Sequence, residues 1–326
     1  MLYVKIGPVE IMSDNGGRIP LSTSLIIAGN EDSTLIDCGS GTKTFDYIQK
    51  NHTVHTIYLT HHHIDHVWGA QLFPDAEKLI NKYDIEKVTD YHELAKSEGL
   101  YAVYGKEGVD KWIQDLKEKT YGNTVVDPKI LHASGTHEYN QVITMSGTDV
   151  MFIHAPGHTQ GYCTPYVMDY GILLTGDIDL TSFGPYYGDA ESDIDQFIQS
   201  ARKTLETDAK YFVTSHHKGI FLREEYEREL EKYLSIIERK EEKIKHLLKN
   251  GCSPGDLIHQ EVFYYKNQSA HSPVRKKTEI ISIVKHLKRL IDHGEPFADY
   301  LADFIRANNL HEEYLEYSNE PCRGRC

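Results

Sequence analysis

The sequence predicts an α/β fold of layered sheets and helices, followed by a helical C-terminal region. Short runs rich in Val, Ile, Leu and Thr alternate with a helical segment over the first 60 residues. Similar runs return between residues 141 and 214, and the chain after about residue 222 has the pattern of helices. Strands that alternate with helices are typical of sheets covered by helical layers.

The strands of the N-terminal part are bounded by Gly, Asn and Asp, which favour turns. We expect these strands at Leu2–Ile6, Ser24–Ala28, Thr34–Asp37 and Thr56–Leu59, with a helix at Lys43–Lys50. From residue 70 to about 120 the sequence predicts a mostly helical insert rich in aromatic residues. Later strands are expected at Gln141–Thr144, Val150–His154, Gly171–Thr175 and Tyr211–Thr214.

The C-terminal region carries its own helix signals. Apolar residues recur at three-, four- or seven-residue spacing from Tyr226 to Leu248, which predicts a long helix with one buried stripe. Ser253-Pro254 supplies an N-cap and a first-turn proline, so we expect a second helix there. A third helix is expected over Lys277–Asp292.

Composition and charge limit the function. The 326 residues are 40% hydrophobic and 26% charged, which excludes intrinsic disorder and suits a catalytic domain, residues 1–221, with a helical region, residues 222–326. The net charge of −14 argues against a broad nucleic-acid binder, although a local basic groove stays open. We expect a cytoplasmic protein with no membrane partner, because neither a secretory signal nor an apolar run of about 18 residues is visible. Five irregularly spaced cysteines favour reduced thiols.

One short segment carries most of the chemistry. The strand Thr56–Leu59 leads into His61-His62-His63-Ile64-Asp65-His66. Alternate side chains of an extended segment share a face, so His61 and His63 can point at one ion. Asp65 and His66 follow in the next turn and can reach a second ion beside it. The imidazoles of His61, His63 and His66 and the Asp65 carboxylate are costly to place so close together without a compensating partner, which favours a metal site.

Further metal ligands are expected directly after three later strands. The candidates are His158, Asp177 and His216. Gly176, which precedes Asp177, allows a close approach of the backbone. A single His or Asp in such a place is usually a capped turn, but three in order after the histidine-rich segment point to one joint site.

The succession HxHxDH, GH, GD and SH resembles the metallo-β-lactamase-fold hydrolases, and Leu35-Ile36-Asp37-Cys38-Gly39 is similar to their early strand motif. The resemblance covers about residues 1–220. It implies a four-layer αββα sandwich with a dinuclear site at one edge of two facing sheets. The resemblance also implies that Asp37 supports the site without binding metal.

The resemblance assigns a role to each candidate ligand. It implies one metal held by His61, His63 and His158, a second held by Asp65, His66 and His216, and Asp177 as the bridge between them. His216 is preferred over His217 because it directly follows the serine, and His62 fills a position that the family leaves variable. We expect His62 to support a ligand or to face solvent.

Such a site has a defined chemistry. Two cations about 3.5–4 Å apart lower the pKa of a bridging water, and the hydroxide attacks an electrophilic carbonyl or phosphorus. Asp65 can orient the hydroxide and carry its proton to the leaving group. The nitrogen and oxygen ligands suit two divalent metal ions, with Zn²⁺ preferred and Fe or Mn as alternatives.

The substrate is less defined by the sequence. Phe183, Tyr186 and Tyr187 follow Asp177 closely and are either pocket walls or core residues. The basic residues from Lys266 to Arg275-Lys276-Lys277 either contact an anionic substrate or form a solvated loop.

We expect a hydrolase of a small ester, thioester or lactone, similar to hydroxyacylglutathione hydrolases or lactonases. A phosphodiesterase or ribonuclease of the same fold is the alternative, and an iron-dependent dioxygenase is a third. A small-molecule substrate is the expected partner. Nucleic acid is disfavoured without being ruled out, and a homodimer stays open.

Overall fold

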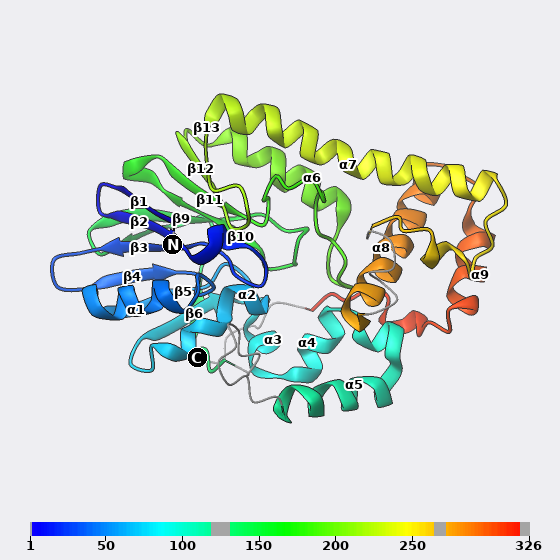
Figure 1. Ribbon diagram of the computed structural model, residues 1–326, viewed down its shortest axis with the longest axis horizontal. Helices are drawn as coiled ribbons and strands as arrows, with labels where there is room; N and C mark the ends of the chain where they lie inside the picture. The colour runs from blue at the N-terminus through cyan, green and yellow to red at the C-terminus, as the bar shows by residue number, and fades with distance from the viewer. Residues whose placement is uncertain (1, 119–130, 264–271, 320–326) are drawn as a thin grey trace.

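The computed structural model describes residues 2–118, 131–263 and 272–319 and consists of two facing sheets with helices outside them (Figure 1). Within these residues the first sheet has seven strands in chain order: β1 (Leu2–Ile6), β2 (Val9–Ser13), β3 (Ser24–Ala28), β4 (Ser33–Ile36), β5 (Val54–Tyr58), β6 (Glu77–Asn81) and β7 (Gly135–His137). The pairs from β1 to β4 are antiparallel, and those from β4 to β7 are parallel.

The second sheet has six strands in the described residues, again neighbours in chain order. They are β8 (Val142–Met145), β9 (Thr148–His154), β10 (Cys163–Val167), β11 (Ile172–Gly176), β12 (Tyr211–Thr214) and β13 (Ile220–Leu222). The pair β11–β12 is parallel and the others are antiparallel. A parallel pair needs a crossover, and the chain between β11 and β12 supplies it with a helix.

The helices of the described residues are α1 (Thr42–Asn51), α2 (Ile64–Val67), α3 (Ile85–Thr89), α4 (Tyr91–Ser97), α5 (Leu100–Glu118), α6 (Ile194–Lys203), α7 (Arg223–Lys249), α8 (Pro273–Asp292) and α9 (Ala298–Ala307). Helix α1 lies on the outer side of the first sheet, and α6 and α7 lie on the outer side of the second (Figure 1). None of these helices combines the length and the apolar character needed to cross a bilayer.

Successive apolar residues of a strand face the other sheet and the outer helices in turn, and this alternation forms the layers of the fold. Leu25 and Ile27 of β3 pack between the sheets with Phe152 of β9. Ile26, the residue between them, packs on the opposite face with Phe45 of α1. This period of two is what a sheet buried on both faces requires. The expected αββα sandwich is confirmed.

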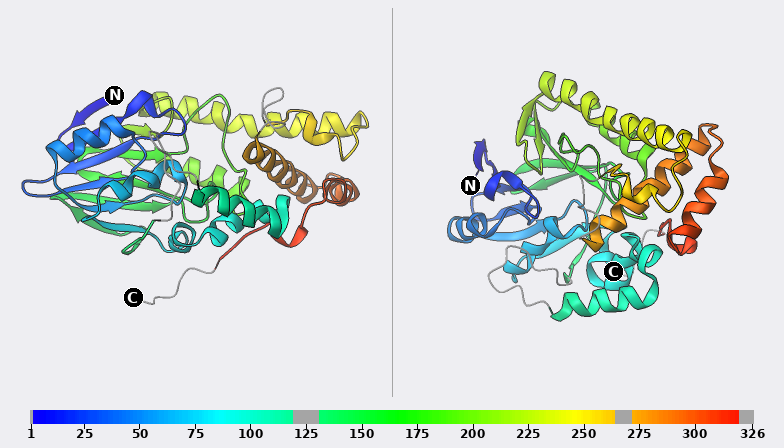
Figure 2. Two further views of the ribbon diagram at one scale, coloured as in Figure 1. Left: turned by 60° about the horizontal axis from the view of Figure 1, so that its bottom comes forward. Right: turned by 45° about the vertical axis from the view of Figure 1, so that its right-hand side comes forward.

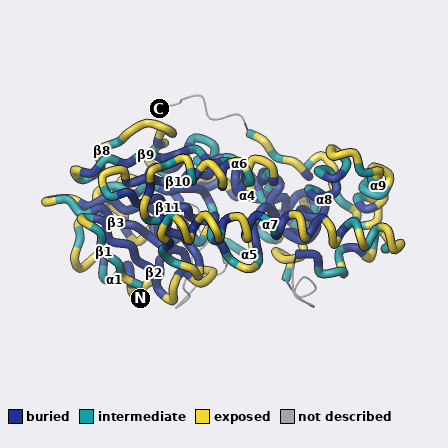
Figure 3. Tube along the Cα trace, turned by 90° about the horizontal axis from the view of Figure 1, so that it is seen from above, coloured by how far each residue is buried: buried dark blue, intermediate teal, exposed yellow. Residues whose placement is uncertain are grey.

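The C-terminal helices continue the core of the second sheet. One apolar cluster joins Phe212 of β12 with Tyr226 of α7, Ile281 of α8 and Phe304 of α9. The helices α8 and α9 gather at one end of the sandwich (Figure 2). Helix α7 shows buried and exposed turns in alternation, as expected for one apolar stripe (Figure 3).

Several local expectations were wrong. In place of the α-helix expected after Ser253-Pro254, the chain forms a turn and a short 3₁₀ helix at Leu257–His259; the Ser253 hydroxyl accepts the Asp256 N–H at 3.2 Å and donates to Asp256 Oδ2 at 2.6 Å. Strand β6 was not expected, although the described part of the segment from residue 70 to about 120 is otherwise mostly helical, as expected. Helix α8 begins at Pro273, four residues earlier than expected, because Ser272 caps it.

Candidate metal centre

The candidate ligands lie where strands end, on the side of the sandwich that faces α8. His61 and His63 follow β5, and His158 lies in the connection from β9 to β10. Asp177 directly follows β11, and His216 follows β12 by two residues. Strands β11 and β12 are parallel neighbours, so their carboxyl ends bring Asp177 and His216 to the same edge.

The structure gathers seven candidates into two groups. The ligand atoms of each group all lie within 4.8 Å of one another. The first group is His61, His63, His158 and Asp177, and the second is Asp65, His66 and His216. The first group holds the ligands expected for the first metal together with the expected bridge. The second group holds the ligands expected for the second metal.

Asp177 divides its two oxygens between the groups. Its Oδ2 lies 3.0 Å from His158 Nε2 and 3.8 Å from His61 Nε2. Its Oδ1 lies 3.0 Å from His66 Nε2 and 3.4 Å from His216 Nε2. A carboxylate placed in this way can bind two cations at once, one through each oxygen.

Most of the imidazoles use their second nitrogen to contact an oxygen outside the centre. The contacts are His66 Nδ1 with Asp37 Oδ2 (2.8 Å), His63 Nε2 with Asp189 Oδ2 (3.0 Å), His158 Nδ1 with the Tyr186 carbonyl (3.0 Å), and His216 Nδ1 with the Leu21 carbonyl (2.9 Å). A ring N–H held by an outer oxygen leaves the other nitrogen free as an acceptor. This tautomer is the one that ligates metals.

Three atoms at the centre are buried without a hydrogen-bond partner among the described residues: His61 Nε2, His66 Nε2 and Asp177 Oδ1. Buried polar atoms are costly to leave unsatisfied, and one cation at each of the two groups would satisfy them. The donor set of imidazoles and carboxylates also suits divalent metals. The clusters are therefore consistent with a dinuclear metal site.

The electrostatics of the centre favour positive charge. Burial alone would raise the pKa of the Asp177 carboxyl, but His66 and His216 outweigh burial and hold the pKa well below its usual range. Burial disfavours the charged form of His216, yet Asp177 and Asp65 raise its pKa to about 10. Protons and a metal ion therefore compete for the same ring nitrogens.

Close backbone contacts fix the ligand loops. Gly176 has a φ of 58°, and a Cβ there would lie 2.2 Å from the Tyr162 hydroxyl oxygen. That hydroxyl accepts the Asp177 N–H at 2.7 Å and donates to the Thr175 carbonyl at 2.6 Å. Gly176 was expected from the sequence but Tyr162 was missed, because its position just before a strand carried no chemical signal.

His62 faces away from both groups and lies in a third one. It is buried with Asp84 and Glu191, at 3.2 and 3.4 Å. Lys87 Nζ lies 2.9 Å from Asp84 Oδ1 and 2.5 Å from Glu191 Oε2. The ammonium of Lys87 therefore balances one of the two carboxylate charges in this third group.

The remaining candidates take different places. His217 is exposed, and its backbone N–H donates to the Gly16 carbonyl. The Tyr186 ring centroid lies 5.7 Å from that of His158, while Tyr187 is buried and bonds His286 of α8 at 2.8 Å. The Phe183 ring packs against the Lys240 ammonium at 4.6 Å.

The expected basic cluster is divided. Lys266 lies outside the described residues, and Arg275 is exposed at the start of α8. Lys277 is buried and lies 2.5 Å from Asp189 Oδ1. A solvated loop is therefore the wrong description of Lys277, because the helix turns this side chain into the protein.

Sequence reasoning missed Asp189 and the role of Lys277. Asp189 lies in an acidic loop with no distinctive spacing. Lys277 did leave a signal, since it occupies the face of α8 that also carries Ile280, Ile281 and Val284. A lysine within an apolar helical stripe predicts a buried partner of opposite charge.

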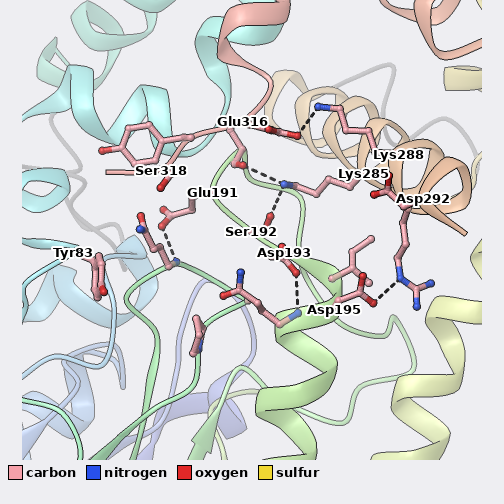
Figure 4. Close-up of a pocket in the computed structure, with 18 of the residues that line it drawn as sticks. Tyr83, Glu191, Ser192, Asp193, Asp195, Lys285, Lys288, Asp292, Glu316 and Ser318 are labelled. Atoms are coloured by element: carbon pink, nitrogen blue, oxygen red, sulfur yellow. Dashed lines mark hydrogen bonds and ion pairs between the residues drawn. The ribbon is translucent and has the colours of Figure 1, made fainter. Parts of the chain in front are cut away.

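A cavity of about 590 Å³ lies behind the ligand loops and contains none of the seven candidates. Its walls come from the 156–160 loop, the start of α6, α8 and the segment that carries Glu316 and Ser318 (Figure 4). Lys285 of α8 is one of the lining residues, and its ammonium donates to the Ser192 carbonyl. The cavity is a separate feature from the candidate centre.

Comparisons with known proteins agree with this geometry. The family model of the metallo-β-lactamase superfamily matches residues 18–216, which is more than half of the chain. A metallo-β-lactamase family protein of Thermus thermophilus is similar in structure, with a TM-score of 0.62 and 19% identity over 88% of this chain and 94% of that one.

A β-lactamase domain protein of Burkholderia ambifaria is also similar, with a TM-score of 0.60 and 14% identity over 90% of this chain and 88% of that one. At such identities the likeness shows the fold alone. Both alignments cover more of this chain than the family match does, so they extend into the C-terminal helices. A comparison with curated proteins gives no match.

Proposed function

The chain belongs to the metallo-β-lactamase superfamily, and from that premise we propose that it is a hydrolase of a small ester, thioester or lactone. It is a metal-dependent enzyme of that superfamily with buried His and Asp clusters. The observation that carries the proposal is the position of Asp177, with one oxygen toward each group of imidazoles. Such a site suits two divalent ions, and the nitrogen-rich ligand set favours Zn²⁺ over Fe or Mn.

Two such cations, when bound, make water more acidic and polarise the oxygen of an electrophilic carbonyl. His61, His63 and His158 would hold one ion, and Asp65, His66 and His216 the other. Asp37 keeps the His66 ring in the orientation that directs Nε2 inward. These residues fix the positions of the metal ligands before the substrate binds. Such preorganisation is usually the largest contribution to stabilising the transition state.

Asp65 is the residue that handles the proton. Its Oδ2 lies 3.4 Å from His216 Nε2, and 17% of its side chain is accessible. A carboxylate that both faces the centre and reaches solvent can accept a proton from the attacking water. It then gives the proton to the alkoxide or thiolate that leaves as the C–O or C–S bond breaks, which yields the alcohol or thiol.

The low accessibility of the candidate ligands supports a small substrate. Among the seven candidate side chains, those of His63, Asp65 and Asp177 are the most accessible, by 14%, 17% and 10%. A bulky nucleic acid has little access to such a centre, whereas a carbonyl at the end of a chain can enter.

A phosphodiester is the second candidate, and one observation favours it. Arg18 and Lys218 are exposed, and both lower the pKa of His217, so they place positive charge beside His216. Burial is the largest cause of that lowering. A positive rim attracts anionic substrates, including carboxylated or phosphorylated esters as well as phosphodiesters.

The test is the hydrolysis rate of one zinc-loaded preparation on a thioester, a lactone and an activated phosphodiester. We expect clear preference for the thioester or the lactone, with Asp177→Asn as the inactive control. Preference for the phosphodiester would overturn the carbonyl assignment in favour of the second candidate. Inactivity on all three would contradict a hydrolase and make iron-dependent oxidation the next reaction to test.

A further inference from the structure

A buried chain of polar contacts leads from the candidate centre into the C-terminal helices. His63 Nε2 lies 3.0 Å from Asp189 Oδ2, and Lys277 Nζ of α8 lies 2.5 Å from Asp189 Oδ1. The side chains of Asp189 and Lys277 are each 1% accessible. We infer that Lys277 is a positioning residue for the metal centre, which acts by holding Asp189 against the ligand His63.

The two oxygens of Asp189 have separate tasks. Oδ2 faces the His63 ring, so it holds the N–H on that side and directs the other nitrogen, Nδ1, toward the centre. Oδ1 receives the Lys277 ammonium and the Tyr186 hydroxyl, the latter at 3.1 Å. Carboxylates that orient a ligating histidine tune both its orientation and its basicity.

The charge balance explains why Lys277 is needed. A carboxylate as buried as Asp189 is costly unless a cation accompanies it. Lys277 Nζ lies 2.5 Å from Asp189 Oδ1 and is equally buried, so it is the cation that accompanies this carboxylate. Without Lys277, Asp189 would lose its closest cation and would still face the nearby carboxyl of Glu98.

A second contact fixes the same loop to the same helix. The Tyr186 hydroxyl lies 3.2 Å from Thr278 Oγ1, next to Lys277 in sequence. A Cβ on Gly188 would lie 2.1 Å from Thr278 Cγ2, so the loop approaches α8 as closely as only glycine permits. Helix α8 therefore sets the position of the loop that carries Asp189, and through it the position of His63.

The inference rests on the proposed metal centre, so its test measures metal binding and not turnover. The metal-free full-length chain is titrated with Zn²⁺, and two binding steps are expected for the wild type. We expect Lys277→Met to weaken the step of the His63 group by about 10- to 100-fold, the range typical of lost outer partners. The zinc affinity of the Asp65 group should change less than about twofold. Lys276→Met, the same substitution at an exposed neighbour, should leave both steps unchanged.

A double variant separates positioning from general damage. Asp189→Asn removes the charge that Lys277 balances, so Lys277→Met should have little further effect on zinc affinity in that background. This comparison also serves if Lys277→Met alone fails to fold, because the double variant buries no unpaired charge. Lys277→Arg should restore part of the lost affinity.

The outcomes are distinguishable. Unchanged zinc steps in Lys277→Met, or equal weakening of both steps with a lower melting temperature, would overturn the inference and leave the proposed function intact. Additive effects of Asp189→Asn and Lys277→Met would overturn it as well. A wild-type chain that binds no Zn²⁺ would contradict the inference and the proposed function together.

Discussion

Asp65 is the most accessible of the seven candidate side chains, with 17% of it exposed against 3% for His216 beside it. The other members of its group are enclosed by the two sheets. Its backbone is held independently, since the Asp65 carbonyl accepts the Ser22 hydroxyl at 2.8 Å. The side chain can therefore be changed with little effect on the loop that carries it.

This gives a prediction for Asp65→Ala. Turnover should fall by about 100-fold or more, the usual size of a lost acid–base group. The melting temperature should stay within a few degrees of the wild type, because the deleted carboxylate contributes little to the core. Steady-state rates and thermal melts on the same preparations would check this. Turnover within twofold of the wild type would exclude Asp65 from the reaction.

Sequence reasoning worked best where ligands follow an apolar strand. His61 to His66, His158, Asp177 and His216 all follow such runs, so local pattern and chemistry coincide. It missed residues whose role depends on a contact with a residue distant in the sequence, such as Tyr162, Asp189 and Lys277. Their partners lie 15, 126 and 88 positions away in the chain. No local signal links such pairs, and only the folded topology brings them together.

At the scale of elements, the loop between β9 and β10 is pressed against the start of α6. Gly157 has a φ of 128°, and a Cβ there would lie 2.1 Å from the Phe197 backbone nitrogen. His158 is the next residue, so its ring position depends on this close approach. Gly147, in the turn between β8 and β9, has a φ of 81° and open space around it.

The two glycines form a matched pair of variants. Gly147→Ala should cost about 1 kcal/mol, the strain of a positive φ alone. Gly157→Ala should lower the free energy of unfolding by more, about 3 kcal/mol, because the backbone at Phe197 must also move. The same movement should displace His158 and weaken zinc binding. Denaturation and zinc titration of both variants would measure this. Equal costs with unchanged zinc binding would show that the contact with α6 does not position His158.

Strands and helices were predicted well where apolar residues recur at a regular spacing along the sequence. The strands Leu2–Ile6, Ser24–Ala28 and Tyr211–Thr214 match the expected bounds, and α7 follows its apolar stripe. The helix expected after Ser253-Pro254 failed because a serine and a proline are equally compatible with a turn. Helix α9 was covered only by the general expectation of helices after about residue 222.

At the scale of the whole molecule, the core of the second sheet continues into α7, α8 and α9. Lys240 of α7 lies inside this continuous core, with its Nζ buried and without a hydrogen-bond partner in the described part of the chain. The Phe183 and Phe263 rings lie 4.6 and 4.8 Å from the amine. Burial lowers the pKa of Lys240 to about 7, although Glu279 opposes this and Arg239 adds to it.

A pH dependence of stability follows from Lys240. Between about pH 7 and its usual pKa of 10.5, the unfolded chain holds a proton on Lys240 that the folded chain lacks, so the free energy of unfolding rises with pH. Below pH 7 the fold carries the full cost of a buried charge.

Lys240→Met removes this dependence. The variant should be more stable than the wild type at pH 6–7, by up to a few kcal/mol, and the difference should shrink toward pH 10. Denaturation at several pH values would show it, with Lys232→Met, at an exposed site of the same helix, as the control. A constant difference across this range would contradict the low pKa.

The stoichiometry of metal binding is the sharpest test of two metal sites that share Asp177. The metal-free chain is dialysed to equilibrium against Zn²⁺, and the bound metal per chain is determined for the wild type and Asp177→Asn. We expect two zinc ions per wild-type chain and weakening of both sites in the variant, since one oxygen faces each group. At most one ion in the wild type, or two sites untouched by Asp177→Asn, would contradict it.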